Sequence, residues 1–173
     1  MIADAYPYVF VMNENVDYGG HVSNAYYSFR STKSHLRYTI YVERFVYNVY
    51  IVNFYLSSMK DSSKRYSHLT NTFEPRKVVN TCINVMLDIY EHDPYASFGF
   101  IGAGMDDDDV NDTKRFRFYS TMIATYFSDR LFHHKENKAN SSYLLINRRH
   151  MAADPQLESK VQDFFVQNFT NFG

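Results

Sequence analysis

The chain of 173 residues contains no tryptophan and a single cysteine, Cys82. One thiol excludes an internal disulfide, which is typical of a reducing compartment and favours a cytoplasmic location. No apolar run approaches the roughly 20 residues that a membrane-spanning helix requires, so no membrane association is expected. The segment Met1–Val16 lacks the basic start of a secretory signal peptide, and Asp4 and Pro7 interrupt it.

Neither sign of charge is in excess. The 18 Lys and Arg residues and 19 Asp and Glu residues give a net charge of −1, so nucleic acid is not an expected partner. The run Asp106–Asp109 supplies carboxylates, which hard cations prefer, but it lacks EF-hand spacing and is expected to be a solvated loop without a metal. Arg148–His150, with Lys135 and Lys138, could form a small basic edge.

Aromatic residues are abundant, with 16 Tyr and 15 Phe. Tyrosine suits half-buried sheet faces and interfaces, because its ring is apolar and its hydroxyl requires a polar partner. No intact catalytic motif accompanies this excess. Together these features predict a non-catalytic protein-interaction domain, with self-association as a homodimer. The end of the chain, with Phe164, Phe165 and Phe169, is the segment expected to dock on its own chain or on a partner.

The hydrophobic pattern predicts both strands and helices in one domain covering residues 1–173. Polar segments expected to be turns or loops are Asn13–Gly20, Thr32–His35, Ser57–Asn71 and Lys135–Ser142. Alternating or continuous apolar runs predict strands at Tyr8–Met12, Ala25–Ser31, Leu36–Val42, Val46–Leu56, Ala96–Ile101 and Tyr143–Asn147. The run Val46–Leu56 is nearly continuous, which indicates a central strand covered on both faces. Apolar stripes at helical spacing predict helices at Arg76–Glu91, Asp112–Ser128 and Asp154–Phe169. This order predicts an α+β fold, with a mixed, largely antiparallel sheet and two to three covering helices.

The order of a long strand, a helix near Arg76, a strand, a helix with Tyr119 and a last strand resembles the GNAT acyltransferase superfamily. The resemblance extends over Tyr38–Asn147. It implies acetyl-CoA as the cofactor, with its pyrophosphate at the helix start near Arg76 and Lys77, and Tyr119 as general acid toward the leaving thiolate. The segment Asn71–Lys77 contains none of the glycines of the superfamily's signature.

A second resemblance is local. The string Asp17–Tyr27 is similar to the motif of hot-dog-fold acyl-CoA thioesterases, with Ser23 in place of an asparagine. The resemblance implies a site of Asp17, His21 and Asn24, in which an acidic residue positions or activates water beside a thioester. The alternative interpretation is a glycine-rich turn that leads into a strand.

A third resemblance rests on the strand-rich start, the first helix and the string Arg115–Tyr119. It is to families of small uncharacterised proteins from Bacteroidetes and their mobile elements, and it implies no activity. Three hypotheses therefore follow from the sequence: an interaction domain of a bacterial or phage-associated protein, a GNAT-like acyltransferase, and a thioesterase. The sequence does not decide whether the chain is an enzyme.

Overall fold

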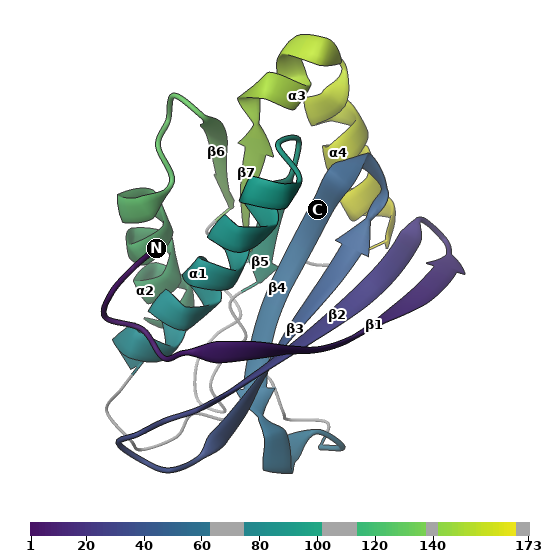
Figure 1. The fold of residues 1–173 in the computed structure, drawn as a ribbon. Coiled ribbons are helices and arrows are strands. Elements are labelled where there is room, and N and C mark those ends of the chain that lie inside the picture. Colours follow the sequence, from purple (N-terminus) through teal and green to yellow (C-terminus); the bar gives the residue numbers. More distant parts are fainter. Residues whose placement is uncertain (63–74, 102–113, 138–141, 169–173) are drawn as a thin grey trace.

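The computed structural model describes residues 1–62, 75–101, 114–137 and 142–168, and these form the predicted α+β fold (Figure 1). The sheet is open and seven-stranded, with the order β1-β2-β3-β4-β5-β7-β6. The strands are β1 (Tyr8–Tyr18), β2 (His21–Arg30), β3 (Arg37–Phe45), β4 (Val49–Leu56), β5 (Ser97–Ile101), β6 (Phe132–Asn137) and β7 (Ser142–Asn147). The helices are α1 (Pro75–His92), α2 (Lys114–Tyr126), α3 (Arg148–Ala153) and α4 (Leu157–Asn168), with short 3-10 turns at Val46–Asn48 and Ser57–Met59.

The sheet is mixed, as predicted, because the chain connects its strands in two ways. Strands β1 to β4 follow one another through short connections and pair antiparallel. Strands β4 and β5 pair parallel, and α1 forms the crossover between them, as parallel strands require. Strand β7 lies between β5 and β6 and is antiparallel to both.

The prediction of a turn-rich segment over Asn13–Gly20 was wrong for most of its length. Strand β1 continues to Tyr18, because Asn13 pairs with Ala25 and the ladder extends toward the turn. Cross-strand pairing thus overrides the low strand propensity of asparagine. The turn itself is confined to Gly19 and Gly20, whose φ angles of 57° and 84° are the left-handed values that a tight hairpin needs.

The sequence pattern predicted neither strand β6 nor helix α3. The loop expected at Lys135–Ser142 was wrong for residues 135–137, which belong to β6, and residues 138–141 lie outside the described residues. Strand β6 is polar and lies at the edge of the sheet, where only one neighbour, β7, pairs with it. Its apolar anchor is Phe132, which is fully buried. Helix α3 begins where the Asn147 side chain caps it by accepting a hydrogen bond from the His150 N–H. The helix has only six residues, which is too short for a helical period to be visible in the sequence.

Both faces of the central sheet are covered. Helices α1 and α2 pack on one face around Phe98, Phe116 and Phe132, and Figure 1 shows both helices on that side. Helix α4 covers the other face, where Phe165 is buried together with Ile51 of β4. Strand β4 is therefore buried from both sides, which confirms the interpretation of its continuous apolar sequence.

The terminal helix packs on its own chain. Phe164 and Phe165 of α4 both contact the ring of Phe45, with ring centroids 5.8 and 5.7 Å apart. These phenylalanines complete the core on this face of the sheet. Phe169 lies outside the described residues. The burial of Phe165 therefore removes it from any surface that could hold a second subunit.

The N-terminal segment fixes the position of α1. Asn84 accepts a hydrogen bond from the Ile2 N–H and donates one back to the Ile2 carbonyl. Thr81 accepts a hydrogen bond from the Tyr6 N–H. These polar side chains lie on the buried part of α1, where they need such partners. Cys82 on the same helix is also buried, and burial raises the pKa of its thiol, so it is a core residue.

Candidate functional site

The two parallel strands separate toward their carboxyl ends. The β4–β5 pairing involves only Val49 with Ser97, Tyr50 with Phe98, and Ile51 with Gly99. Beyond these residues β4 continues to Leu56 alongside β3, whereas β5 continues alongside β7. We call the place where they part, residues 52–56 of β4 and 100–101 of β5, the fork.

Tyr119 lies at the fork. It projects from α2 and is half-buried. Its ring centroid is 6.0 Å from that of Phe54 on β4 and 5.8 Å from that of Phe100 on β5. One aromatic ring from each separating strand thus contacts it. The sequence singled out Tyr119 from the order of elements alone, and the structure places its ring against one aromatic side chain from each of the two parallel strands.

Arg76 and Lys77 occupy the first turn of α1. Arg76 is exposed, and the Lys77 ammonium lies 4.6 Å from the centre of the Tyr6 ring, a cation–π distance. The first turn contains no acidic residue. Free N–H groups and the helix dipole favour an anion at such a helix start. Pro75 lacks an N–H, so the donors of this turn begin at Arg76.

The fork and the start of α1 lie at the same end of the sheet. Helix α1 returns the chain from the carboxyl end of β4 to the start of β5, and α2 begins beyond the carboxyl end of β5 (Figure 1). In open sheets with parallel strands, ligands bind outside the carboxyl ends of those strands. The three residues of the predicted acyl-CoA site therefore lie at the end where a ligand is expected.

The residues of the thioesterase-like motif lie in the β1–β2 hairpin. The His21 Nε2 and Asn24 Oδ1 atoms are 2.6 Å apart, and Asn24 donates a 2.8 Å hydrogen bond to Glu14. The His21 ring stacks on Phe45. Asp17 is exposed and adopts a φ of 59° beside the turn. A strand follows the motif, where the hot-dog fold has its long helix, so these contacts hold a hairpin together.

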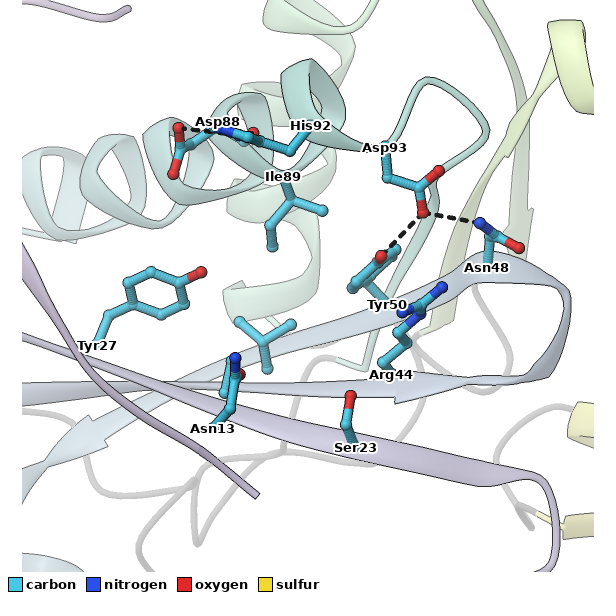
Figure 2. A pocket seen from close by; sticks show the side chains of 12 residues that line it. Asn13, Ser23, Tyr27, Arg44, Asn48, Tyr50, Asp88, Ile89, His92 and Asp93 are labelled. Atoms are coloured by element: carbon cyan, nitrogen blue, oxygen red, sulfur yellow. Dashed lines mark hydrogen bonds and ion pairs between the residues drawn. The ribbon is translucent and has the colours of Figure 1, made fainter. Parts of the chain in front are cut away.

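A different site is the cleft between strands β1 to β4 and the carboxyl half of α1, which we call the α1 cleft (Figure 2). Its volume is about 450 Å³. In the sheet register Ser23 lies opposite Arg44, and Arg44 lies opposite Tyr50, so these three side chains line up across adjacent strands. The other lining residues are Asn13, Ala25, Tyr27, Val42, Asn48, Asp88, Ile89, His92 and Asp93.

Asp93 organises one end of the α1 cleft. Its Oδ2 atom accepts hydrogen bonds of 2.8 Å from both the Tyr50 hydroxyl and the Asn48 amide, and Oδ1 accepts one from the Tyr95 N–H. Burial, followed by the hydrogen bond to Asp93, raises the pKa of Tyr50, so its hydroxyl stays protonated. Nothing in the sequence indicates this role, because Asn48 and Tyr50 lie 45 and 43 residues from Asp93 along the chain.

No metal centre is present among the residues that the structure describes. These residues include no group of three or more His, Cys, Asp or Glu side chains that could hold an ion. His134, one of two adjacent histidines, lies within hydrogen-bonding distance of the Phe127 carbonyl and the Tyr143 hydroxyl, which gives it a structural role. Asp106–Asp109 lie outside the described residues. None of the helices described here has both the length and the apolar character needed to cross a membrane.

Comparisons with protein-family models, with curated proteins and with solved structures found no match to this chain. The fork and the α1 cleft are therefore the two features of the molecule from which a function can be inferred.

Proposed function

We propose that the protein is an acyl-CoA-dependent acyltransferase that binds acetyl-CoA at the fork, in the manner that its resemblance to the GNAT superfamily implies. One observation carries the proposal. The half-buried ring of Tyr119 is held between Phe54 and Phe100, where two parallel strands separate. In the proposed complex the Tyr119 hydroxyl would contact the thioester of acetyl-CoA bound where the strands separate.

The start of α1 supports the proposal through charge. The pyrophosphate of acetyl-CoA is an anion, and Arg76 and Lys77 provide two cations on a helix turn without acidic residues. The helix dipole adds to their attraction. Arg76 is exposed and available to a phosphate, whereas Lys77 would exchange its contact with Tyr6 for one. The chain offers no glycine-rich loop here, so these side chains would supply most of the phosphate contacts.

Tyr119 suits the chemistry of the transfer step. Acetyl-CoA supplies an acetyl group activated as a thioester. When an acceptor nucleophile attacks the carbonyl carbon, the carbon–sulfur bond breaks and the sulfur leaves as a thiolate, which needs a proton. The Tyr119 hydroxyl would donate that proton, and the acceptor releases one to solvent. A general acid of this kind contributes about 10² to 10⁴ in rate.

Acetyl-CoA is expected to raise the melting temperature of the protein, because a ligand that binds only the native state stabilises it. At a concentration 100 times the Kd the gain is about 2.7 kcal/mol, which corresponds to roughly 5–10 °C for a chain of this size. Differential scanning fluorimetry with 1 mM acetyl-CoA measures the shift. Arg76→Glu should lower the apparent affinity for acetyl-CoA at least tenfold, and the shift in melting temperature should be correspondingly smaller.

Arg149→Glu is the matched control. Arg149 is an exposed arginine on α3, at the opposite end of the sheet from the fork. This variant carries the same change of charge and should keep the full shift. Absence of any shift with 1 mM acetyl-CoA in the unmodified protein would rule out the proposed function.

A separate feature favours the interaction domain as a second candidate function. Strand β1 is an edge strand of 11 residues. Its consecutive residues Val9, Phe10, Val11 and Met12 are 64, 54, 56 and 45% exposed. Natural proteins commonly protect such edges with charges, because unprotected strands pair with other chains. Antiparallel pairing of β1 with its own copy would be two-fold symmetric, the default for a homodimer.

We expect self-association through β1, and Val11→Lys should abolish it by placing a charge on the paired edge. Multi-angle light scattering at 200 μM should give a two-chain mass for the unmodified protein and a one-chain mass for the variant. Val166→Lys is the control, since Val166 is similarly exposed on α4. A one-chain mass for the unmodified protein at this concentration would refute the dimer.

A further inference from the structure

The α1 cleft contains one permanently charged cation, Arg44. The guanidinium carbon of this half-buried residue lies 5.6 Å from the centre of the Tyr50 ring. Among the described residues no carboxylate lies within ion-pair distance of it. A half-buried guanidinium has given up part of its hydration and retains its donors, so it is suited to an anionic group.

The two acids of the α1 cleft do not neutralise Arg44. Asp93 already accepts three hydrogen bonds, from Tyr50, Asn48 and the Tyr95 N–H. Asp88 lies on the helix wall, where its carboxylate is 3.6 Å from the Nδ1 atom of His92. Neither acid forms an ion pair with Arg44, so the guanidinium can bind a ligand. They also make a second negative charge on that ligand unfavourable, because like charges repel in a partly desolvated site.

Further polar groups lie beside Arg44 on the same wall of the cleft. Ser23 is directly opposite Arg44 in the register, and Asn13 comes from the neighbouring strand β1. Figure 2 shows both side chains directed into the space below α1. Neither side chain forms a hydrogen bond within the described part of the chain. The guanidinium and the hydroxyl therefore lie side by side, and the Asn13 amide lies beside Ala25 on the same face of the sheet.

The rest of the cleft is apolar. Ala25 lies opposite Val42 in the sheet register, one pair away from Ser23 and Arg44 on the same face, and these two form the floor. Ile89 of α1 forms the roof, and Tyr27 forms the far wall (Figure 2). Burial raises the pKa of Tyr27, with a smaller effect of Asp88, so this wall stays uncharged at neutral pH.

We propose that the α1 cleft is a binding site for a small organic carboxylate with an apolar body. Arg44 pairs with the carboxylate, Ser23 donates a hydrogen bond to it, and the apolar body lies over Ala25 and against Ile89. The volume of about 450 Å³ is in the range of small-molecule sites. A monoanion matches the single guanidinium between two acids better than a phosphate dianion does.

This site is distinct from the fork. Tyr50 in the α1 cleft and Phe54 at the fork lie on the same face of β4, four residues apart, which is about 13 Å along a strand. The proposal stands without acyl transfer, and its test uses binding alone. Failure of the carboxylate to bind would leave the acetyl-CoA experiment unaffected, and the reverse also holds.

The test is an NMR titration of the full chain with 3-phenylpropionate, a carboxylate of 11 non-hydrogen atoms. We expect a Kd on the order of a millimolar, which is usual for so small a ligand. The largest backbone amide shifts should be at Ser23, Ala25, Val42 and Arg44. Uncharged 3-phenylpropionamide should bind at least tenfold more weakly, and inorganic phosphate should leave these amides unshifted. Tighter binding of phosphate than of the carboxylate would overturn the assignment.

Arg44→Gln should weaken 3-phenylpropionate binding at least tenfold. Arg37→Gln is its matched control, because Arg37 is on the same strand but faces the other side of the sheet. Ala25→Leu should also abolish binding by filling the floor of the cleft, with little change in melting temperature. An unchanged Kd in Arg44→Gln, or amide shifts confined to another surface at 10 mM ligand, would refute the proposed site.

Discussion

Replacing Asn147 with leucine is expected to destabilise the protein by about 3–5 kcal/mol, because three buried or part-buried main-chain groups lose their partner at once. The Asn147 side chain is 1% exposed. Its amide donates hydrogen bonds to the carbonyls of Pro94 and Ala96, and its Oδ1 atom accepts one from the His150 N–H. Leucine has a similar volume but can form none of these bonds.

Urea denaturation measures this prediction, with Asn168→Ala as the control. Asn168 is exposed in the last turn of α4, where its amide donates to the Phe164 carbonyl, and its loss should cost less than about 0.5 kcal/mol. Asn147 lies at the end of β7 and links the start of β5 to α3. A loss below 1 kcal/mol in Asn147→Leu would show that these main-chain groups find other partners.

The sequence predicted the elements whose pattern is strong and local. The continuous apolar run of β4 indicated burial on both faces, and the apolar stripe of α1 gave a helix only one residue longer at each end than expected. The alternation in β3 was equally clear. In each case the burial that stabilises the element also leaves a periodic trace in the sequence.

Elements stabilised by distant partners left no such trace. Strand β6 is polar, and its pairing with β7 stabilises it. The second half of β1 is stabilised in the same way by its pairing with β2. The 3-10 turn at Val46–Asn48 occupies the first three residues of the strand predicted at Val46–Leu56, with Tyr47 and Asn48 at φ angles of 63° and 56°. This shorter strand depends on the turn geometry between β3 and β4.

The same contrast between local and distant partners applies to the candidate sites. Tyr119 could be singled out from the sequence because one helix and its neighbouring strands follow in order along the chain. The α1 cleft was not found, because its polar groups come from four strands and a helix that only the register brings together. Arg44 shows the difficulty. In the sequence it is one of 18 basic residues, and only its place opposite Ser23 and Tyr50 distinguishes it.

Tyr119→Phe is expected to lower kcat for acetyl transfer by about 10² or more, since a general acid contributes 10² to 10⁴ in rate. The phenylalanine keeps the ring that contacts Phe54 and Phe100, so the melting temperature should change by no more than about 4 °C. The affinity for acetyl-CoA should also stay within a factor of about three, because the lost hydroxyl acts on the leaving sulfur in the transition state.

The assay follows release of the CoA thiol with Ellman's reagent, across a panel of amine acceptors. Phe118→Leu is the control for packing, because Phe118 is the neighbour of Tyr119 on α2 and their rings are in contact. This variant should retain most of the kcat, since it removes no proton donor. At high pH the kcat values of the two proteins should converge, because the leaving thiolate then needs no protonation. Equal kcat values for Tyr119→Phe and the unmodified protein at neutral pH would remove Tyr119 from the chemistry, even where acetyl-CoA binds at the fork.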